Sequence, residues 1–360
     1  MPLVEVRGAR LNYLQVGPAE NPAAEDLVMV HGLATNLAFW FMPHAQHFAQ
    51  RYRVTVFDLR GHGRSQMTPD GYRPQDLAGD LAGLLDALGI ARAHIVAHSY
   101  GGVVALGMAC RQPERIASLV LADTHLSSAR ERGDQAAAWS DEGRVRAALS
   151  RAGLSLDPRD PYFGYRLLTE VAQLQREQLT VPADVAELVG PLMSRVGART
   201  ASQWLKLMRE TQAERELMAD DGLCLEMLGR LQFPILAMYG DHSQARLTGA
   251  QLREVWPHAQ LRRVRDAGHF FPSTRPQEVI DSCERFWAGQ PVVPRTPRQG
   301  EPRANHFRSD RVYLDEGGWY FQTREDGRMG PFPEQEEAQR ELSAYVQRMQ
   351  AEAPLRARSS

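Results

Sequence analysis

Short runs of apolar residues alternate with segments of helical periodicity along the first third of the chain. A run such as Leu27–Val30 has the length and composition of a buried strand. Leucines recur at helical spacing from Leu77 to Leu88, which predicts a helix between two such runs. This alternation predicts an α/β fold with a mostly parallel sheet flanked by helices. The predicted strands occupy residues 27–30, 53–57, 94–97, 118–122, 234–239 and 260–264.

The pattern changes near residue 124. From about residue 127 to residue 230 there is no strand pattern, and the apolar residues recur at helical spacing on mixed faces. Strand character then returns, and a helix predicted over residues 276–287 closes the unit. We therefore predict one sheet domain over residues 1–290, interrupted by a helical lid at about residues 125–230.

The composition changes again near residue 290. Residues 289–305 carry four prolines and three arginines, so residues 291–305 are predicted to be an extended linker. Residues 311–314 and 319–323 have strand character on either side of a Gly-Gly turn, which predicts a hairpin. A charged amphipathic helix is predicted from Glu334 to Glu352. Residues 306–352 are therefore expected to form a small α+β appendage, a hairpin plus a helix.

Composition and charge narrow the class of protein. The chain is 43% apolar and 24% charged, as is usual for a soluble globular protein with a large core. Its net charge of −2 argues against a nucleic-acid-binding surface. No apolar run is long enough to span a bilayer, and residues 1–7 lack the apolar core of a signal peptide. We therefore expect a cytoplasmic protein without a membrane span or a nucleic-acid partner.

The cysteines and histidines do not suggest a metal site. Cys110, Cys224 and Cys283 are odd in number and widely spaced, which fits neither a disulfide framework nor a metal knuckle. No pair among the eleven histidines has, with nearby carboxylates, the spacing of metal ligands. Neither a metal nor an organic cofactor is expected.

The strongest chemical signal is Ala97-His98-Ser99-Tyr100-Gly101-Gly102, which directly follows a predicted strand and precedes a predicted helix. A nucleophilic serine needs a sharp strand-to-helix turn that lifts its hydroxyl clear of the sheet. That turn leaves little room two residues to either side, where this chain has Ala97 and Gly101. Because the following helix directs its N-terminal amides at the site, developing negative charge is favoured there. Ser99 is therefore the candidate nucleophile.

Two further segments supply the other parts of a serine-nucleophile site. His31-Gly32-Leu33 ends an earlier strand, so the Leu33 amide can join the Tyr100 amide in an oxyanion hole. Gly268-His269 comes just after the last predicted strand, which makes His269 the candidate base. A serine first and a histidine last is the order of an α/β-hydrolase.

On these residues the chain resembles an α/β-hydrolase of the lid-bearing, esterase-like branch over about residues 1–290. The resemblance rests on His31-Gly32, on the glycine-rich turn Asp58–Ser65, on the Ser99 segment and on Gly268-His269. It implies hydrolysis by Ser99 and His269 without a cofactor, and a mainly structural role for residues 58–65. His31 is expected to organise its loop, and three other histidines are expected to neighbour the site: His62, His98 and His242.

The C-terminal segment resembles a short uncharacterised bacterial domain built around Trp-Tyr-Phe, Thr-Arg-Glu and Gly-Pro-Phe. It also resembles small aromatic modules that bind proline-rich peptides. Two roles stay open: packing on the hydrolase domain or on another copy of the chain, or association with a protein through a proline-rich peptide.

The acid of the triad departs from the family pattern. Family members commonly carry Gly-x-x-Asp after the penultimate strand, and here Gly240 is followed by Asp241, His242 and Ser243, so a serine stands at the expected position. Asp241 lies in the right loop but two residues early. Asp123 ends the strand after the Ser99 helix, a position that some relatives use. We take Asp123 as the first choice and Asp241 as the alternative.

Together these features predict hydrolysis of a carboxylic ester or thioester through an acyl-enzyme, with a small acyl molecule as the substrate. Two alternatives remain, since a fold does not fix a function. The same triad could hydrolyse a carbon–carbon bond or open a lactone. A hydrolase scaffold without its usual acid could also be catalytically inert and serve for binding.

Overall fold

The computed structural model describes residues 2–18, 21, 23–127, 142–160, 162–189, 198–292, 312–315, 318–322, 328–334, 337–338, 340–342 and 344–345. The chain divides into two compact units, Met1–Pro294 and Arg295–Ser360. The first unit extends beyond Gln290 because Val292 is buried and its amide donates a hydrogen bond to the Gln260 side chain. Residues 293–311, which include most of the predicted linker, lie outside the described part of the chain.

The first unit contains an eight-stranded sheet in the order β1-β2-β4-β3-β5-β6-β7-β8. Strands β3 to β8 are parallel, and β1 and β2 form an antiparallel hairpin beside β4. The predicted fold class, a mostly parallel sheet flanked by helices, is confirmed. The strands are β1 (Leu3–Val6), β2 (Ala9–Val16), β3 (Asp26–Val30), β4 (Arg53–Phe57), β5 (Ala93–His98), β6 (Ile116–Ala122), β7 (Ile235–Gly240) and β8 (Gln260–Val264).

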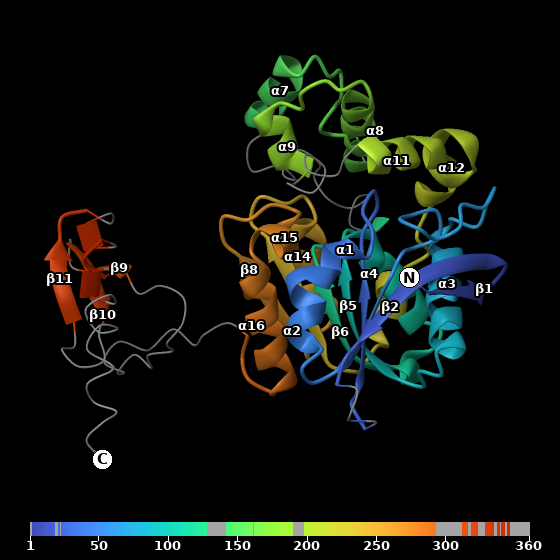
Figure 1. The fold of residues 1–360 in the computed structure, drawn as a ribbon, viewed down its shortest axis with the longest axis horizontal. Coiled ribbons are helices and arrows are strands. Elements are labelled where there is room, and N and C mark those ends of the chain that lie inside the picture. Colours follow the sequence, from blue (N-terminus) through green and yellow to red (C-terminus); the bar gives the residue numbers. More distant parts are fainter. Residues whose placement is uncertain are drawn as a thin grey trace. The chain divides into compact units, whose positions relative to one another are not determined.

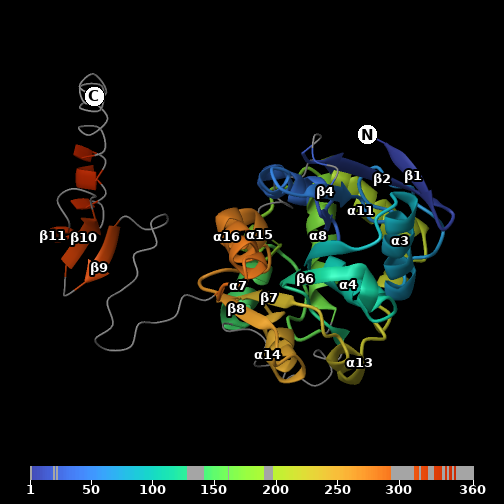
Figure 2. The same ribbon diagram turned by 90° about the horizontal axis from the view of Figure 1, so that it is seen from below.

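Helices cover both faces of this sheet (Figures 1 and 2). Alternate residues of a strand point to opposite faces, and in β3 Val28 and Val30 join one core while Leu27 and Met29 join the other. The first core is closed by α3 (Pro74–Ala87), α4 (Tyr100–Ala109) and α14 (Arg246–Val255), and the second by α1 (Ala38–Trp40), α2 (Gln46–Phe48), α15 (Phe271–Thr274) and α16 (Pro276–Trp287). Two-sided burial explains why the central strands are almost continuously apolar.

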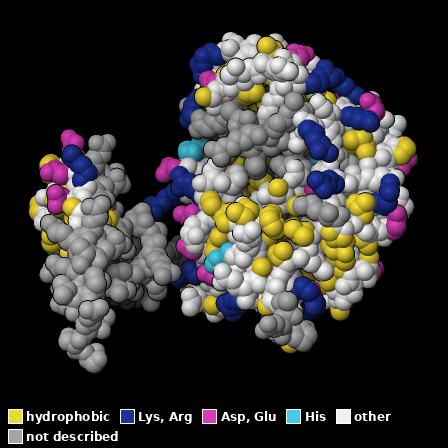
Figure 3. All heavy atoms as spheres, viewed as in Figure 1, with side chains coloured by type: hydrophobic (Ala, Val, Ile, Leu, Met, Phe, Trp, Pro, Cys, Tyr) yellow, Lys and Arg dark blue, Asp and Glu magenta, His cyan; other side chains and the backbone are white. Residues whose placement is uncertain are grey.

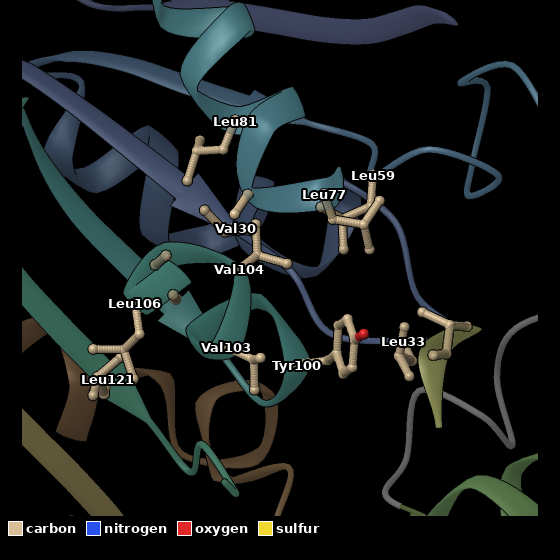
Figure 4. Packing of buried hydrophobic residues seen from close by; sticks show 14 of the residues in the cluster. Val30, Leu33, Leu59, Leu77, Leu81, Tyr100, Val103, Val104, Leu106 and Leu121 are labelled. Atoms are coloured by element: carbon tan, nitrogen blue, oxygen red, sulfur yellow. The ribbon is translucent and has the colours of Figure 1, made fainter. Parts of the chain in front are cut away.

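Close packing of α4 against the sheet fixes the position of Ser99, the residue that precedes the helix. Val104 of α4 faces Val30 of β3 and the α3 residues Leu77 and Leu81 (Figure 4), and Val103 is buried in the same cluster. Burial of each such side chain contributes about 1.5–3 kcal/mol, so this helix is held firmly against the sheet. The N-terminus of α4 is therefore fixed relative to the end of β5.

Among the described residues between β6 and β7 there are helices and loops but no strand. Most of these helices lie together beyond the carboxyl ends of the strands (Figure 1), whereas α13 (Leu225–Gly229) packs beside α14 (Figure 2). The side chains of Gln203 and Glu216 help to attach the lid to the sheet domain. The Gln203 amide donates to the Gly63 carbonyl at 2.9 Å, and the buried Glu216 carboxylate accepts the Tyr72 amide at 2.9 Å. The helices are α7 (Glu142–Arg151), α8 (Phe163–Arg176), α9 (Ala183–Val189), α11 (Ala198–Glu210), α12 (Ala213–Leu217) and α13 (Leu225–Gly229).

The second unit holds a three-stranded antiparallel sheet in the order β11-β10-β9. The predicted hairpin corresponds to β9 (Val312–Asp315) and β10 (Gly318–Gln322), and β11 (Arg328–Phe332) adds a third strand. Phe321 of β10 is buried and stacks on Phe332 with ring centroids 5.7 Å apart. The described residues of the predicted C-terminal helix, 337–338, 340–342 and 344–345, are helical. The predicted α+β appendage is thus confirmed as a small sheet domain.

Four described histidines are buried in the first unit: His31, His44, His62 and His98. Burial lowers the pKa of His31, His44 and His62 to about 4. For His44 the charge of His47 acts in the same direction, and neither ring nitrogen has a hydrogen-bond partner within the described residues. The unfolded chain binds a proton at each site near pH 6.5, whereas the folded chain does so only near pH 4. Stability is therefore lost as the pH falls from about 6.5 to about 4.

We expect His44→Phe to weaken this acid sensitivity. Phenylalanine keeps the edge contact with Trp40, whose ring centroid lies 5.0 Å away, and cannot bind a proton. A pKa lowered to about 4 corresponds to at most about 3 kcal/mol of stability lost per site. The measurement is the decrease in Tm between pH 7 and pH 5. His258→Phe is the control, because His258 is exposed. An unchanged pH dependence in His44→Phe would show that other groups cause the acid sensitivity.

Candidate active site

Ser99 lies on a sharp turn between β5 and α4. Its backbone has φ 56° and ψ −126°, a positive φ that is strained for any residue other than glycine. The turn is possible because its neighbours are small. A Cβ on Gly101 would lie 2.5 Å from the His31 carbonyl oxygen, and one on Gly32 would lie 2.8 Å from the Ser99 Cβ. Ala97 is fully buried beneath the turn.

The structure brings Ser99, His269 and Asp123 into one line of hydrogen bonds. Ser99 Oγ lies 2.9 Å from His269 Nε2, and His269 Nδ1 lies 2.7 Å from Asp123 Oδ2. Ser99 follows β5, Asp123 follows β6, and His269 follows β8, so parallel strands carry all three residues to the same edge of the sheet. The imidazole can thus accept a proton from Ser99 while Asp123 fixes its orientation.

The Asp123 carboxylate is fully buried and has a donor for each oxygen. The Gly240 amide donates to Oδ1 at 2.8 Å, and the Ser243 hydroxyl donates to Oδ2, the oxygen that also faces His269. Because a buried polar group is costly without hydrogen bonds, these donors are what allow the carboxylate to lie in the interior. The sequence did not predict the contact between Ser243 and Asp123. It showed only that Ser243 stands at the position where the family commonly has the acid.

The alternative acid, Asp241, lies outside this constellation. Its carboxylate forms an ion pair with Arg263, whose side chain is 76% exposed. The Asp241 amide donates to the Val264 carbonyl, so the chain just after β7 still pairs with the end of β8. The structure therefore places Asp123, and not Asp241, against the imidazole.

His98 supports the loop that carries His269. Its Nε2 lies 3.0 Å from the His269 carbonyl oxygen and must donate a proton to it, and its ring stacks on Phe39 with centroids 4.6 Å apart. Burial and, next, the neighbouring His269 lower the pKa of His98 well below its ordinary value. A neutral His98 can therefore hold the loop without adding a charge beside the base.

Three further histidines, His31, His62 and His242, lie in different environments. His31 accepts the Leu59 amide at its Nε2 at 3.0 Å, which fits the expected loop-organising residue. His62 lies against His31, with ring centroids 5.5 Å apart, and His242 lines the pocket beside Ser99.

Ser99 and His269 open onto a pocket of about 800 Å³, which Leu33 and Tyr100 also line. Within the described residues, no partner accepts the Leu33 amide proton. The lid supplies an apolar wall on α7 and α8. Its residues are Val145, Ala148, Phe163, Leu167 and Leu168. A volume of this order suits a small-molecule ligand with an apolar part.

Three observations concern the expectations about a metal site, a membrane span and a nucleic-acid-binding surface. Within the described part of the chain, no three His, Cys, Asp or Glu side chains gather where they could hold a metal ion. No described helix has both the length and the apolar character needed to cross a membrane. On the face drawn in Figure 3, basic and acidic side chains are interspersed.

Parts of this chain are similar to named enzymes. A Pantoea ananatis protein named as a carbamate hydrolase, RutD, is 42% identical over 110 residues, which are 30% of this chain and 40% of that protein. The chain therefore covers about two fifths of that relative's length. A 3-oxoadipate enol-lactonase of Acinetobacter baylyi is 29% identical over 279 residues, which are 76% of this chain and 91% of that protein.

Solved structures repeat the likeness in the fold. The enol-lactonase from Burkholderia xenovorans LB400 has a TM-score of 0.55 and 25% identity, over 80% of this chain and 100% of that one. The carboxylesterase CesB from Bacillus subtilis has a TM-score of 0.58 at 20% identity, over 80% and 90% of the two chains, and shows the fold alone.

Two families match different parts of the sequence. Residues 297–351 match a domain of unknown function, DUF6316, in agreement with the uncharacterised domain that the sequence resembles. Residues 27–276 match the alpha/beta hydrolase fold. This second match spans more than half of the chain, and the sheet order and the Ser99 turn of the structure agree with that fold. The chain belongs to the α/β-hydrolase fold family.

Proposed function

We propose that this chain is a serine hydrolase that cleaves a carboxylic ester or thioester through an acyl-enzyme. The observation that carries the proposal is the line of hydrogen bonds from Ser99 Oγ through His269 to Asp123 Oδ2, at 2.9 and 2.7 Å. Ser99 stands on a strained turn and lines a pocket, as a nucleophile of this kind requires.

In the first half of the reaction, Ser99 Oγ attacks the carbonyl carbon and His269 Nε2 takes the hydroxyl proton. The amides of Leu33 and Tyr100, with the N-terminus of α4 behind Tyr100, stabilise the oxyanion. His269 then gives its proton to the leaving alcohol or thiol. A water molecule repeats these steps on the acyl-enzyme and releases the acid and Ser99. Throughout, Asp123 orients the imidazole and stabilises its protonated form.

The opening of a lactone by the same steps is the second candidate. It is favoured by the similarity to the Acinetobacter baylyi enol-lactonase, which extends over 91% of that protein. A lactone is a cyclic ester, so its alcohol would remain attached to the acyl group on Ser99. The third possibility, an inert scaffold, rests on the missing acid at position 243; the contact between Asp123 and His269 supports the active hydrolase over it.

The test of this function is covalent labelling followed by a substrate panel. A fluorophosphonate probe should label the full chain, and the labelled peptide should contain Ser99. Hydrolysis of chromogenic esters, thioesters and lactones of increasing acyl length would then identify the substrate class. Absence of both labelling and turnover would contradict the proposal, whereas labelling with turnover of lactones alone would favour the second candidate.

We also propose that residues 306–352 form a separate domain that associates with a protein or with another copy of the chain. A chain that ends at Pro294 is then expected to stay folded and keep most of its esterase activity, because α16 and Val292 already close the core. Activity, Tm and oligomeric state are measured on both lengths of chain. Loss of activity in a folded short chain would show that the second unit completes the enzyme.

A further inference from the structure

Ser243 stands where the family commonly has the triad acid, and it is in contact with the acid that this chain uses instead. Its side chain is buried. The Ala245 amide donates to Ser243 Oγ at 3.1 Å, while the hydroxyl lies against Asp123 Oδ2. Because the amide already occupies an acceptor site of the hydroxyl, and a carboxylate can only accept, the hydroxyl proton must point to Asp123.

We propose that Ser243 is a positioning residue that keeps the Asp123 carboxylate turned toward His269, and that an aspartate introduced at position 243 can replace the carboxylate of Asp123. This inference rests on the proposed function. The Gly240 amide holds Oδ1 at 2.8 Å, and the Ser243 hydroxyl holds Oδ2 beside His269 Nδ1. These two donors fix the rotation of the carboxylate plane, so Oδ2 meets the imidazole at 2.7 Å.

The hydroxyl also sets how strongly Asp123 attracts the imidazole proton. A hydrogen bond to the carboxylate stabilises its negative charge. When that donor is removed, the carboxylate becomes more basic and stabilises protonated His269 more strongly. The pKa that governs the acid limb of kcat/KM should then rise. A residue that only filled space would lower activity by the same factor at every pH.

The same contact makes position 243 a second place for the acid. A group at Ser243 reaches the oxygen that Asp123 presents to the imidazole. If residue 123 loses its side chain, an aspartate at position 243 can extend into the vacated space. Asp123→Gly is the suitable partner change, since residue 123 has a positive φ of 56° that glycine adopts without strain.

The first experiment compares Ser243→Ala with the wild type across pH. We expect kcat/KM to fall roughly 10-fold, as for the loss of a hydrogen bond to a charged group, and the acid limb to move to higher pH. Ser243→Thr, which keeps the hydroxyl, should restore the wild-type acid limb. Ser273→Ala is the matched control, because the Ser273 hydroxyl bonds to the Phe270 carbonyl near the site and not to Asp123. An unmoved acid limb in Ser243→Ala would overturn the positioning role.

The second experiment transfers the acid and has a readout that needs no turnover. The His269 Nδ1–H proton, bonded to a carboxylate, should give a far-downfield proton resonance in the wild type. We expect this resonance to shift in Ser243→Ala, to vanish in Asp123→Gly and to return in Asp123→Gly/Ser243→Asp. The double variant should also exceed Asp123→Gly in kcat by at least about 10-fold.

The two proposals can fail separately. A wild type that shows the resonance and its expected shifts but hydrolyses no substrate refutes the proposed function and keeps the role of Ser243. A wild type that hydrolyses esters, with a double variant no better than Asp123→Gly in either measurement, refutes the transfer.

Discussion

Ser99→Ala is expected to lower kcat by at least ~10³ while the fold persists, because the variant keeps the Cβ of the turn and loses only the attacking oxygen. The pocket and the bond between His269 and Asp123 do not depend on that oxygen. The measurement is ester turnover of purified wild type and variant, with their Tm values beside it. Wild-type turnover in Ser99→Ala would refute the mechanism.

Ser99→Gly is the informative companion to this variant. It removes the same hydroxyl and also relieves the strain of a side chain at φ 56°. We expect it to be as inactive as Ser99→Ala and more stable by roughly 1 kcal/mol. Equal stability of the two variants would mean that the turn stores no strain, even though both had lost activity.

Much of this site could be predicted because the nucleophile turn is a local structure. The small residues Ala97 and Gly101 and the order of strand and helix lie within a few positions of Ser99. The central strands were equally readable, since burial on both faces makes them continuously apolar. The antiparallel hairpin of β1 and β2 was missed, because its outer strand is mostly exposed and carries Glu5 among its apolar residues.

Contacts between residues that lie far apart in the sequence could not be predicted from local patterns. Helical spacing in the lid shows that residues are apolar but not what they face. Leu167 lines the pocket, whereas Leu207 packs over Gly61 and Trp204 bonds to Thr169 on the neighbouring lid helix. Likewise, the sequence could rank Asp123 above Asp241 but could not reveal that Ser243 would contact the acid across the sheet edge.

The second large effect is expected from Asp123→Asn, which should lower kcat by about 10²–10⁴ and leave the fold intact. Asparagine tolerates the positive φ of residue 123 better than most residues and can still accept the Gly240 amide. Its amide group would, however, present a donor to His269 Nδ1. The imidazole would then carry its proton on Nε2, facing Ser99, and could not act as the base.

Asp241→Asn is the matched control, since it makes the same chemical change in the neighbouring loop. Asp241 bonds to Arg263 and lies outside the line of hydrogen bonds from Ser99 to Asp123, so we expect less than about a twofold change in kcat. Both variants are assayed on one ester across pH. Collapse of the Asp241 variant alone would place the acid two residues before its family position. If neither variant collapsed, Ser99 and His269 would work as a dyad, and the bond between His269 and Asp123 would serve orientation without being required for proton transfer.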